Sequence, residues 1–416
     1  MPDRAKPVPA TPAGPLAGVC VIDLTTVLMG PFTTQMLGDM GADVVKVEAV
    51  QGDPVRRVGP GRHPEMGSIF LQGNRGKRSL VLDLKQPAGR NAVFKLAEKA
   101  DVLVYNIRPQ AMARLGLTYE EVSAANPRIV YAGMFGYDQR GPYAARPAYD
   151  DLIQSLVALP TLAQMAGGDR PRYVPLAIAD RYVAAIGVGA ILGALIHRTN
   201  SGRGQRVDIP MFETMAQMVL GDHMGGRTFE PPLGPPGYKR SLSPERVPYR
   251  TQDGYISVLA YNDKQWRSFF AAVGRPELPD ADPRFADVAS RTVHTDALCA
   301  LVAEVFGTRP TAEWLAILDR ADIPAMPLNT LDALIDDPHL AAIGFLETME
   351  HPSEGAIRAI GVPTRWSETQ AAPGRPAPRL GEHSLEVLRE AGYTAAEIER
   401  LLADGVTADG SAGASP

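Results

Sequence analysis

The sequence contains very little cysteine. Cys20 and Cys299 are the only two in 416 residues, and they lie far apart along the chain. Two such distant thiols indicate neither a framework of disulfides nor a cysteine-based metal site. We therefore expect a protein of the reducing cytoplasm.

Long apolar segments and a large excess of one charge are also missing. The longest run made only of apolar residues and glycine, from Val183 to Ile196, is shorter than the roughly 18 residues that a membrane span needs. The first residues, MPDRAKPVPATPAGPLAG, lack the apolar core of a signal peptide. The formal net charge of −5 provides no general attraction to nucleic acid or to an anionic membrane. We expect neither a membrane nor a nucleic acid among the partners.

The common catalytic and cofactor motifs are absent as well. None of the seven histidines has the spacing of metal ligands. The chain has no G-x-S-x-G elbow and no P-loop lysine motif, and the turn TTVLMGPFTTQMLG lacks the G-x-G-x-x-G of nicotinamide-binding proteins. We therefore expect no metal and no permanently bound cofactor.

Apolar segments rich in β-forming residues recur through the first third of the chain, with helical patterns between them. They lie at residues 18–26, 42–48, 77–84, 101–107 and 128–137. Strands that alternate with helices predict a parallel sheet flanked by helices. The sequence therefore predicts an α/β fold with a Rossmann-like large domain.

A stretch dense in glycine, proline and serine follows residue 224 and indicates a domain boundary. We assign residues 15–224 to the large domain and residues 225–345 to a smaller α+β domain with its linkers. The segment 346–403 is expected to return to the large domain. The chain ends, 1–14 and 404–416, are expected to be disordered.

One acidic side chain, Asp180, stands just before an apolar run in AIADRYVAAIGVGAILGALIHR. The run predicts a helix over residues 181–198 that is surrounded by protein, because it is apolar on every side. Asp180 can be the N-cap of this helix, since aspartate is a preferred cap. It can also be a nucleophile, because a carboxylate that stays ionised at a helix N-terminus can attack an activated acyl group without a general base.

Basic side chains lie close to the ends of several predicted strands. The segment NRGKRS, residues 74–79, contains Lys77, and Arg114 and Arg140 follow later strands. Because ligands of open α/β sheets bind outside the carboxyl ends of the strands, these cations could converge on phosphates. A solvated basic loop is the alternative. Tyr149, Asp150 and Asp151, in RPAYDDLIQS, could line a pocket, although Tyr-Asp-Asp before an apolar segment also marks the start of a helix.

Several segments together resemble the class III CoA-transferase family, which contains formyl-CoA and carnitine CoA-transferases and the 2-methylacyl-CoA racemases. They run in family order from about residue 15 to residue 403, and they are VIDLTTVLMGPFTTQMLGDMGADVVKVE, NRGKRSLVLDLK, ADVLVYNIRPQAMARLGL, LAIADRYVAAIGVGAILGALIHRTNSGRGQRVDIPM, IPAMPLNTLDALIDDPHL and RLGEHSLEVL. The resemblance implies an interlocked homodimer of two ring-like subunits. In each, both chain ends build the large domain and the middle builds the small one.

The same matching implies roles for individual residues. Asp180 falls at the position of the family's acyl-accepting aspartate. The coenzyme A contacts implied by the resemblance are the backbone of Val27, Leu28 and Met29 beside the thioester, and the side chains of Asn74, Lys77, Asn106 and Arg114. Tyr149 and Arg140 are the candidates for the substrate pocket.

The sequence departs from the family pattern at two places. Formyl-CoA transferases have a glutamine where this chain has Leu28, and their glycine-rich flap in the small domain is not found here. An oxalate or formate acceptor is therefore disfavoured. The racemases have a histidine at the position of Tyr149, and without it an exchange of protons at the α-carbon loses one acid or base. A transferase is favoured over a racemase.

We therefore expect an enzyme that moves coenzyme A from an acyl-CoA donor, with succinyl-CoA a candidate, to a small carboxylic acid. The resemblance implies an aspartyl-CoA thioester on Asp180 as the intermediate. Acyl-CoA and the free acid are then substrates. A 2-methylacyl-CoA racemase on the same fold and a CoA-binding protein without turnover are the alternatives.

Overall fold

A computed structural model describes residues 14–410, and it divides into two compact units. Of the described residues, the first unit combines 14–153, 176–216 and 338–410, and the second combines Gln154–Pro175 with Gln217–Asp337. The first therefore contains the beginning and the end of the described chain, and the second contains most of the middle. Residues Gln154–Pro175, which we assigned to the large domain, group with the second unit.

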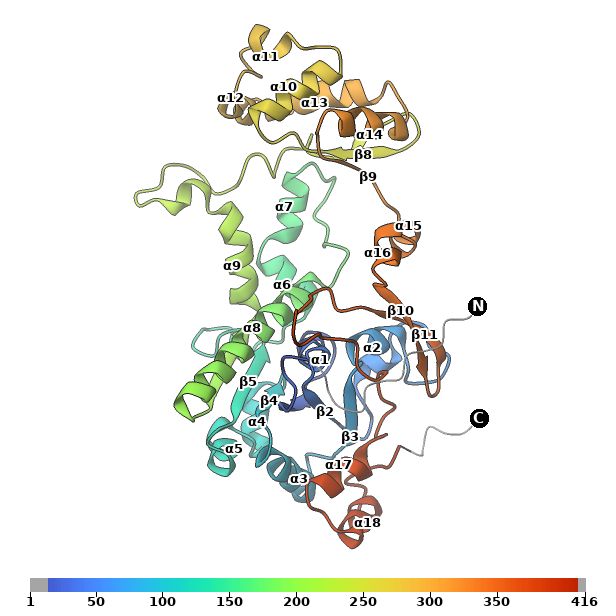
Figure 1. The fold of residues 1–416 in the computed structure, drawn as a ribbon. Coiled ribbons are helices and arrows are strands. Elements are labelled where there is room, and N and C mark those ends of the chain that lie inside the picture. The colour runs from blue at the N-terminus through green and yellow to red at the C-terminus, as the bar shows by residue number, and fades with distance from the viewer. Residues whose placement is uncertain (1–13, 411–416) are drawn as a thin grey trace. The chain divides into compact units, whose positions relative to one another are not determined.

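The first unit alternates strands and helices along most of its length (Figure 1). In chain order its elements are β1 (Cys20–Leu24), α1 (Met29–Asp39), β2 (Asp43–Glu48), a 3-10 helix (Pro54–Arg57), α2 (Ser68–Gly73), β3 (Lys77–Val81), α3 (Pro87–Ala97), β4 (Val102–Tyr105), α4 (Pro109–Leu115), α5 (Tyr119–Ala125), β5 (Val130–Phe135), the start of α6 (Asp150–Leu156), α8 (Ile178–Ser201), β6 (Gln205–Pro210), the first part of α9 (Met211–His223), α16 (Pro338–Ala342), β10 (Leu346–His351), β11 (Gly355–Ile360), α17 (Ser384–Glu390) and α18 (Ala395–Ala403). Each of the five predicted strands is present.

The centre of the first unit is a six-stranded sheet in the order β3-β2-β1-β4-β5-β6. Every neighbouring pair of strands in it is parallel. The order reverses between β1 and β4, so the loops that leave these two neighbours diverge to opposite sides of the sheet. Such a switch point is the usual ligand site of an open α/β sheet, just outside the carboxyl ends of its strands.

The two faces of this sheet differ in chemistry. One face is apolar and forms the main core with α3, α17 and α18, through residues that include Leu24, Val45, Leu80, Val93 and Leu388. The other face carries buried charged and polar side chains at alternating strand positions, namely Asp23, Lys46, Glu48, Lys77 and Ser79. Because successive side chains of a strand point to opposite faces, the alternation in DVVKVE produces both faces from one strand.

The end of the chain packs on the beginning of the sheet. Helix α17 lies beside β3, as Figure 1 shows by the red helix next to the blue strand. The expectation of disorder from residue 404 onward is wrong up to residue 410, because Val406 and Thr407 are buried and the Thr407 hydroxyl donates to the Val81 carbonyl at 2.7 Å. The remaining terminal residues of that expectation, 1–13 and 411–416, lie outside the described part of the chain.

Helix α8 is only partly enclosed. Its buried stripe contains Val183, Gly187 and Ile191, and α1 packs along it. Ile186 and Ile196 are exposed, so the expectation of a helix surrounded by protein on every side is wrong for the single chain. Among the described residues, α8 alone has the length and hydropathy of a membrane span. Its packing on α1 and its charged first turn are instead typical of a core helix.

The second unit has a separate aromatic core. Its elements are the end of α6, α7 (Leu159–Met165), the end of α9, a 3-10 helix (Gly225–Thr228), β7 (Tyr249–Arg250), β8 (Tyr255–Val258), α10 (Asp263–Ala272), α11 (Leu278–Ala281), α12 (Val288–Val293), α13 (Thr295–Phe306), α14 (Thr311–Arg320), β9 (Ala325–Pro327) and α15 (Leu331–Ile335). β7 and β8 form an antiparallel pair that is joined through Asp253 and Gly254. Phe269, Phe306 and Trp314 lie at the centre of the core.

Candidate active site

The loop after β1 and the end of β4 meet at the switch point of the sheet. Asn106 follows β4 directly, and its side chain clamps the backbone of Thr26 in the loop after β1. The Asn106 amide donates to the Thr26 carbonyl at 2.7 Å, and its oxygen accepts the Thr26 N–H at 3.0 Å. Asn106 therefore holds the shape of this loop with both ends of its side chain.

Val27, the next residue of the loop, has an unfavourable backbone conformation. Its φ of 71° lies in the left-handed region, which costs most for a β-branched residue. Its N–H donates to Oδ1 of the buried Asp53 at 3.1 Å, which fixes the peptide in place. The Val27 side chain is 40% exposed, whereas Leu28 and Met29 are buried where α1 begins. The three residues that we expected beside a thioester thus lie at the switch point.

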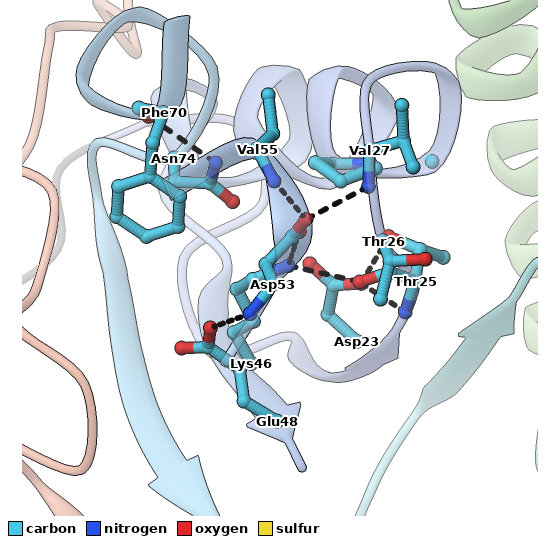
Figure 2. A network of polar contacts seen from close by, with 12 residues as sticks. Asp23, Thr25, Thr26, Val27, Lys46, Glu48, Asp53, Val55, Phe70 and Asn74 are labelled. Atoms are coloured by element: carbon cyan, nitrogen blue, oxygen red, sulfur yellow. Dashed lines mark hydrogen bonds and ion pairs between the residues drawn. The ribbon is translucent and has the colours of Figure 1, made fainter. Parts of the chain in front are cut away.

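A network of buried charges lies beneath this loop, on the polar face of the sheet (Figure 2). Lys46 donates to the Thr25 carbonyl at 2.8 Å and to Oδ2 of Asp53 at 2.9 Å. Asp23 accepts the hydroxyl of Thr25 at 2.5 Å. Although burial opposes ionisation, Lys77 and Lys46 lower the pKa of Asp23 to about 2. Buried ion pairs of this kind specify one loop arrangement, because any other leaves a charge unpaired.

The network continues away from the loop toward the C-terminal segment. Glu48 accepts two hydrogen bonds from Arg56, at 2.7 and 2.8 Å, and Arg56 also donates to the Pro378 carbonyl. The backbone N–H of Asp53 donates to Glu48 at 3.1 Å. One continuous set of contacts therefore joins the loop after β1 to the last part of the chain.

Lys77 and Asn74 belong to this network rather than to the surface. The Lys77 ammonium is fully buried and donates to Asp23, to the Pro31 carbonyl and to Asn74, at 2.9, 2.8 and 2.8 Å. Its three hydrogens are used, so in this structure it has none left for the CoA phosphate that we expected it to bind. Asn74 is buried as well and donates to the Phe70 carbonyl. Both residues therefore support α1 and α2 from below.

Asp180 lies in the first turn of α8 and does not cap it. The helix begins at Ile178, and the N-cap position is Ala177, which provides no side-chain hydrogen bond. The N–H of Asp180 instead donates to Oδ1 of Asp150, the first residue of α6, at 3.0 Å. The interpretation of Asp180 as an N-cap is therefore wrong, which leaves its carboxylate free of that role.

The ionisation of Asp180 also differs from expectation. Burial and the negative charge of Asp150 together raise the pKa of Asp180 to about 7, against a smaller opposing effect of Arg181. A carboxyl group with this pKa is only partly ionised at neutral pH, whereas the helix N-terminus alone predicts full ionisation. A carboxyl group with a pKa near the working pH is typical of functional sites, because structural carboxylates are usually paired and remain acidic.

The start of α8 contacts the second turn of α1. The Arg181 guanidinium lies 4.2 Å from the centre of the Phe32 ring. The Thr33 hydroxyl donates to the Ala184 carbonyl at 3.2 Å, next to Gly187, where a Cβ atom would meet Thr33 and Met134. These contacts anchor the helix that carries Asp180 to the helix that follows the switch-point loop.

The three remaining candidates are exposed. Arg114 lies in the last turn of α4, after the clamp residue Asn106, and forms no ion pair with any residue between 14 and 410. Arg140 is paired with Asp138 at 2.5 Å. Tyr149 is 65% exposed immediately before α6. Arg114 is thus the candidate that keeps its donors for a phosphate. Residues 14–410 contain no cluster of three or more potential metal ligands.

Sequence reasoning missed Asp53 and Lys46, and it named Asp150 only as a possible pocket residue. The alternation of charged residues with valines in DVVKVE is a detectable signal, since charge inside a strand of a parallel sheet is unusual and has to be paired. Asp53 has no comparable signal, because its contacts with Val27 and Lys46 form only on folding. The contact of Asp150 with Asp180 likewise joins two helices that are 30 residues apart in the sequence.

The fold and the site define a class of enzyme. The family model of CoA-transferase family III matches residues 16–384, so the chain belongs to this family. The computed structure is also similar to the crystal structure of a CAIB/BAIF family protein from Brucella suis, with a TM-score of 0.76, 31% identity and coverage of 91% of this chain and 100% of that one.

Relatives of known activity narrow the class further. The chain is 33% identical to succinate–glutarate CoA-transferase of Agrobacterium fabrum, over 90% of this chain and 95% of the relative. It is 32% identical to human succinyl-CoA:glutarate CoA-transferase, over 94% of this chain and 90% of the relative. This chain is therefore a CoA-transferase. An acyl-CoA and a carboxylic acid are the substrates that fit the names of both relatives.

Proposed function

We propose that this CoA-transferase works through a covalent intermediate on Asp180, with succinyl-CoA as donor and a small carboxylic acid as acceptor. The observation that carries the assignment is the carboxyl group of Asp180, placed in the first turn of α8 with a pKa of about 7. A carboxylate of raised pKa is a stronger nucleophile than an ordinary one, and about half of it is ionised at neutral pH.

The reaction conserves the energy of the thioester. Ionised Asp180 attacks the donor carbonyl carbon, a C–O bond forms, the C–S bond breaks, and CoA leaves as thiolate. The thiolate then attacks the aspartyl carbonyl of the anhydride and releases the donor acid, which leaves an aspartyl-CoA thioester. The acceptor carboxylate reverses both steps and departs as the new acyl-CoA.

The loop at the switch point supports the proposal. Helix α1 begins at Met29 without a side-chain cap, so the first N–H groups of this helix have no such partner. N–H groups at a helix start favour the negative charge that develops on a carbonyl oxygen or on a departing thiolate. The hydrogen bonds of Asn106 and Asp53 keep this loop in one conformation before substrate binds, which avoids reorganisation during the reaction.

Arg114 is our candidate for the CoA phosphates. It is exposed on α4, and α4 directly follows the strand end that carries Asn106. A guanidinium with free donors binds phosphate in a bidentate manner. Tyr149 and Arg140 stay candidates for the substrate pocket.

A homodimer with interlocked subunits, working in the cytoplasm, completes the proposal. The exposed apolar residues Ile186 and Ile196 on α8 support it, because the long central helix of a stable enzyme does not usually leave such side chains in water. Both cysteines are free, which fits a reducing compartment.

The test is to trap the intermediate. Arg172 and Arg181 border the tryptic peptide YVPLAIADR, in which Asp180 is the only side-chain carboxylate. The protein is incubated with succinyl-, glutaryl- and acetyl-CoA in turn, quenched with hydroxylamine and analysed by mass spectrometry. We expect a hydroxamate on Asp180 with at least one donor and none in the Asp180→Asn variant.

Two other results would contradict the proposal. A protein that binds CoA but is never modified would be a binder without turnover. Deuterium exchange at the α-carbon of a 2-methylacyl-CoA without modification of Asp180 would indicate a racemase.

A further inference from the structure

A second carboxylate lies beside Asp180, and the proposed chemistry so far leaves it without a role. Asp150 starts α6 and lies 30 residues before Asp180 in the sequence. Its Oδ1 accepts the backbone N–H of Asp180 at 3.0 Å. A side chain from another helix thus satisfies the first turn of α8, and it also brings a negative charge close to the nucleophile.

We propose that Asp150 is a positioning residue that favours acylation of Asp180 through like-charge repulsion, an inference that rests on the function proposed above. A neutral acceptor would satisfy the same N–H. The hydrogen bond therefore does not require the charge of Asp150. The charge has a separate effect, which depends on the ionisation state of Asp180.

The charge of Asp150 acts differently on the free enzyme and on the enzyme whose Asp180 is acylated. The nucleophile is the ionised form of free Asp180, and repulsion by Asp150 raises the free energy of this carboxylate. In the anhydride, and again in the aspartyl-CoA thioester, the Asp180 carbonyl is neutral because one oxygen has formed a bond to carbon or has been replaced by sulfur. The repulsion is relieved in both covalent states, so it lowers the free energy of loading relative to the free carboxylate.

Few other charges act on Asp180 within the first unit. Arg181 is its neighbour on α8, lies over Phe32 and opposes the effect of Asp150. The single acid of α1, Asp39, is held by Arg75, at 2.7 and 2.9 Å.

The two strands that pack on α8, β5 and β6, also contribute no unpaired charge. The Tyr131 hydroxyl on β5 donates to the Leu117 carbonyl, and Arg206 and Asp208 on β6 form an ion pair at 2.6 Å. Among the described acids, Asp150 is the one whose charge raises the pKa of Asp180, after burial.

The experiment compares two single-charge variants of α6. Asp150→Asn keeps an oxygen that can accept the N–H of Asp180 but removes the charge. Asp151→Asn removes the same charge from the exposed neighbouring residue and is the matched control. The rate at which Asp180 is loaded by succinyl-CoA is measured between pH 5 and pH 9 by rapid quench and hydroxylamine trapping on the peptide YVPLAIADR.

We expect Asp150→Asn to shift the midpoint of the pH profile to lower pH by about one unit, the size typical of one nearby like charge. At high pH, where Asp180 is ionised in every variant, loading becomes roughly three- to tenfold slower because the carboxylate is less basic. Asp151→Asn should change neither quantity. An Asp150→Asn variant with the wild-type midpoint would overturn the inference, since a purely structural role affects the rate at every pH alike.

A second readout needs no turnover and separates this inference from the proposed function. The unfolding temperature of the wild type and of Asp180→Asn is measured across the pH range, and the difference between them gives the pH midpoint at which Asp180 ionises. The same difference is then measured between Asp150→Asn and the double variant Asp150→Asn/Asp180→Asn. A lower midpoint in this second pair supports the role of Asp150 even if no donor loads Asp180. Equal midpoints in the two comparisons would contradict it whether or not the enzyme is active.

Discussion

Replacing Asp180 with asparagine should stabilise the protein, and the gain should depend on pH. Burial and Asp150 raise the pKa of Asp180 from 3.8 to about 7, a shift of about three units. Each unit corresponds to about 1.4 kcal/mol of difference between the two protonation states. The ionised carboxylate therefore costs up to about 4 kcal/mol in the folded state, and this is an upper limit because the side chain keeps some contact with water.

The sign follows from the binding of protons. Between pH 3.8 and about pH 7 the folded state holds the proton of Asp180 more tightly than the unfolded state, so raising the pH favours unfolding. The stability contributed by protonated Asp180 is complete below pH 3.8 and is lost as the pH rises through about 7. Asparagine resembles the protonated acid in shape and does not ionise, so its variant escapes this loss.

The assay is chemical or thermal unfolding of both proteins at pH 5, 6, 7 and 8. We expect the stability advantage of Asp180→Asn over the wild type to grow from about 1–2 kcal/mol at pH 5 to about 2–4 kcal/mol at pH 8, because most of the loss falls between these two pH values. Asp151→Asn, on the exposed side of α6, should show no such trend. A constant difference between wild type and Asp180→Asn across this range would refute a raised pKa for Asp180.

Three other substitutions test the loop and the phosphate site. Lys77→Met leaves Asp23 buried without its ion-pair partner, so urea unfolding should show that the free energy of unfolding falls by about 3–5 kcal/mol. A weaker affinity for CoA at unchanged stability would instead mean that the ammonium binds phosphate. Val27→Gly removes the cost of a valine whose φ lies in the left-handed region, so the free energy of unfolding should be unchanged or higher by about 1 kcal/mol. A clear loss of stability would show that this backbone conformation carries no strain. Arg114→Ala should raise the Kd of CoA about tenfold at low salt in calorimetry, whereas Arg389→Ala, an exposed arginine on α17, should leave it unchanged.

The strands of the first unit follow from local sequence. The positions of β1 to β5 were predicted because apolar and β-branched residues alternate with helical patterns, and those patterns act within a few residues. The hairpin of β7 and β8 follows from the Asp-Gly turn for the same reason. Family membership followed from ordered segments along the whole chain, and the family model over residues 16–384 confirmed it.

The candidate site was predictable only in part. Asp180, Val27 and Asn106 were singled out from matching segments, but the contacts that give them their properties were not. Lys77 illustrates the difference, since a lysine near a strand end suggests phosphate binding, and only the fold shows that it is buried against Asp23. Likewise, an apolar helix predicts burial on every side, yet a single chain leaves part of α8 exposed.

The sequence by itself determined the α/β alternation, the family and the identity of the nucleophile candidate, because each depends on residue types and short spacings. The tertiary structure decided the strand order, the clamp of Asn106 on Thr26 and the pairing of the buried charges. It also decided the ionisation of Asp180, because a pKa depends on burial and on charges brought together by folding, here from Asp150 across 30 residues of chain.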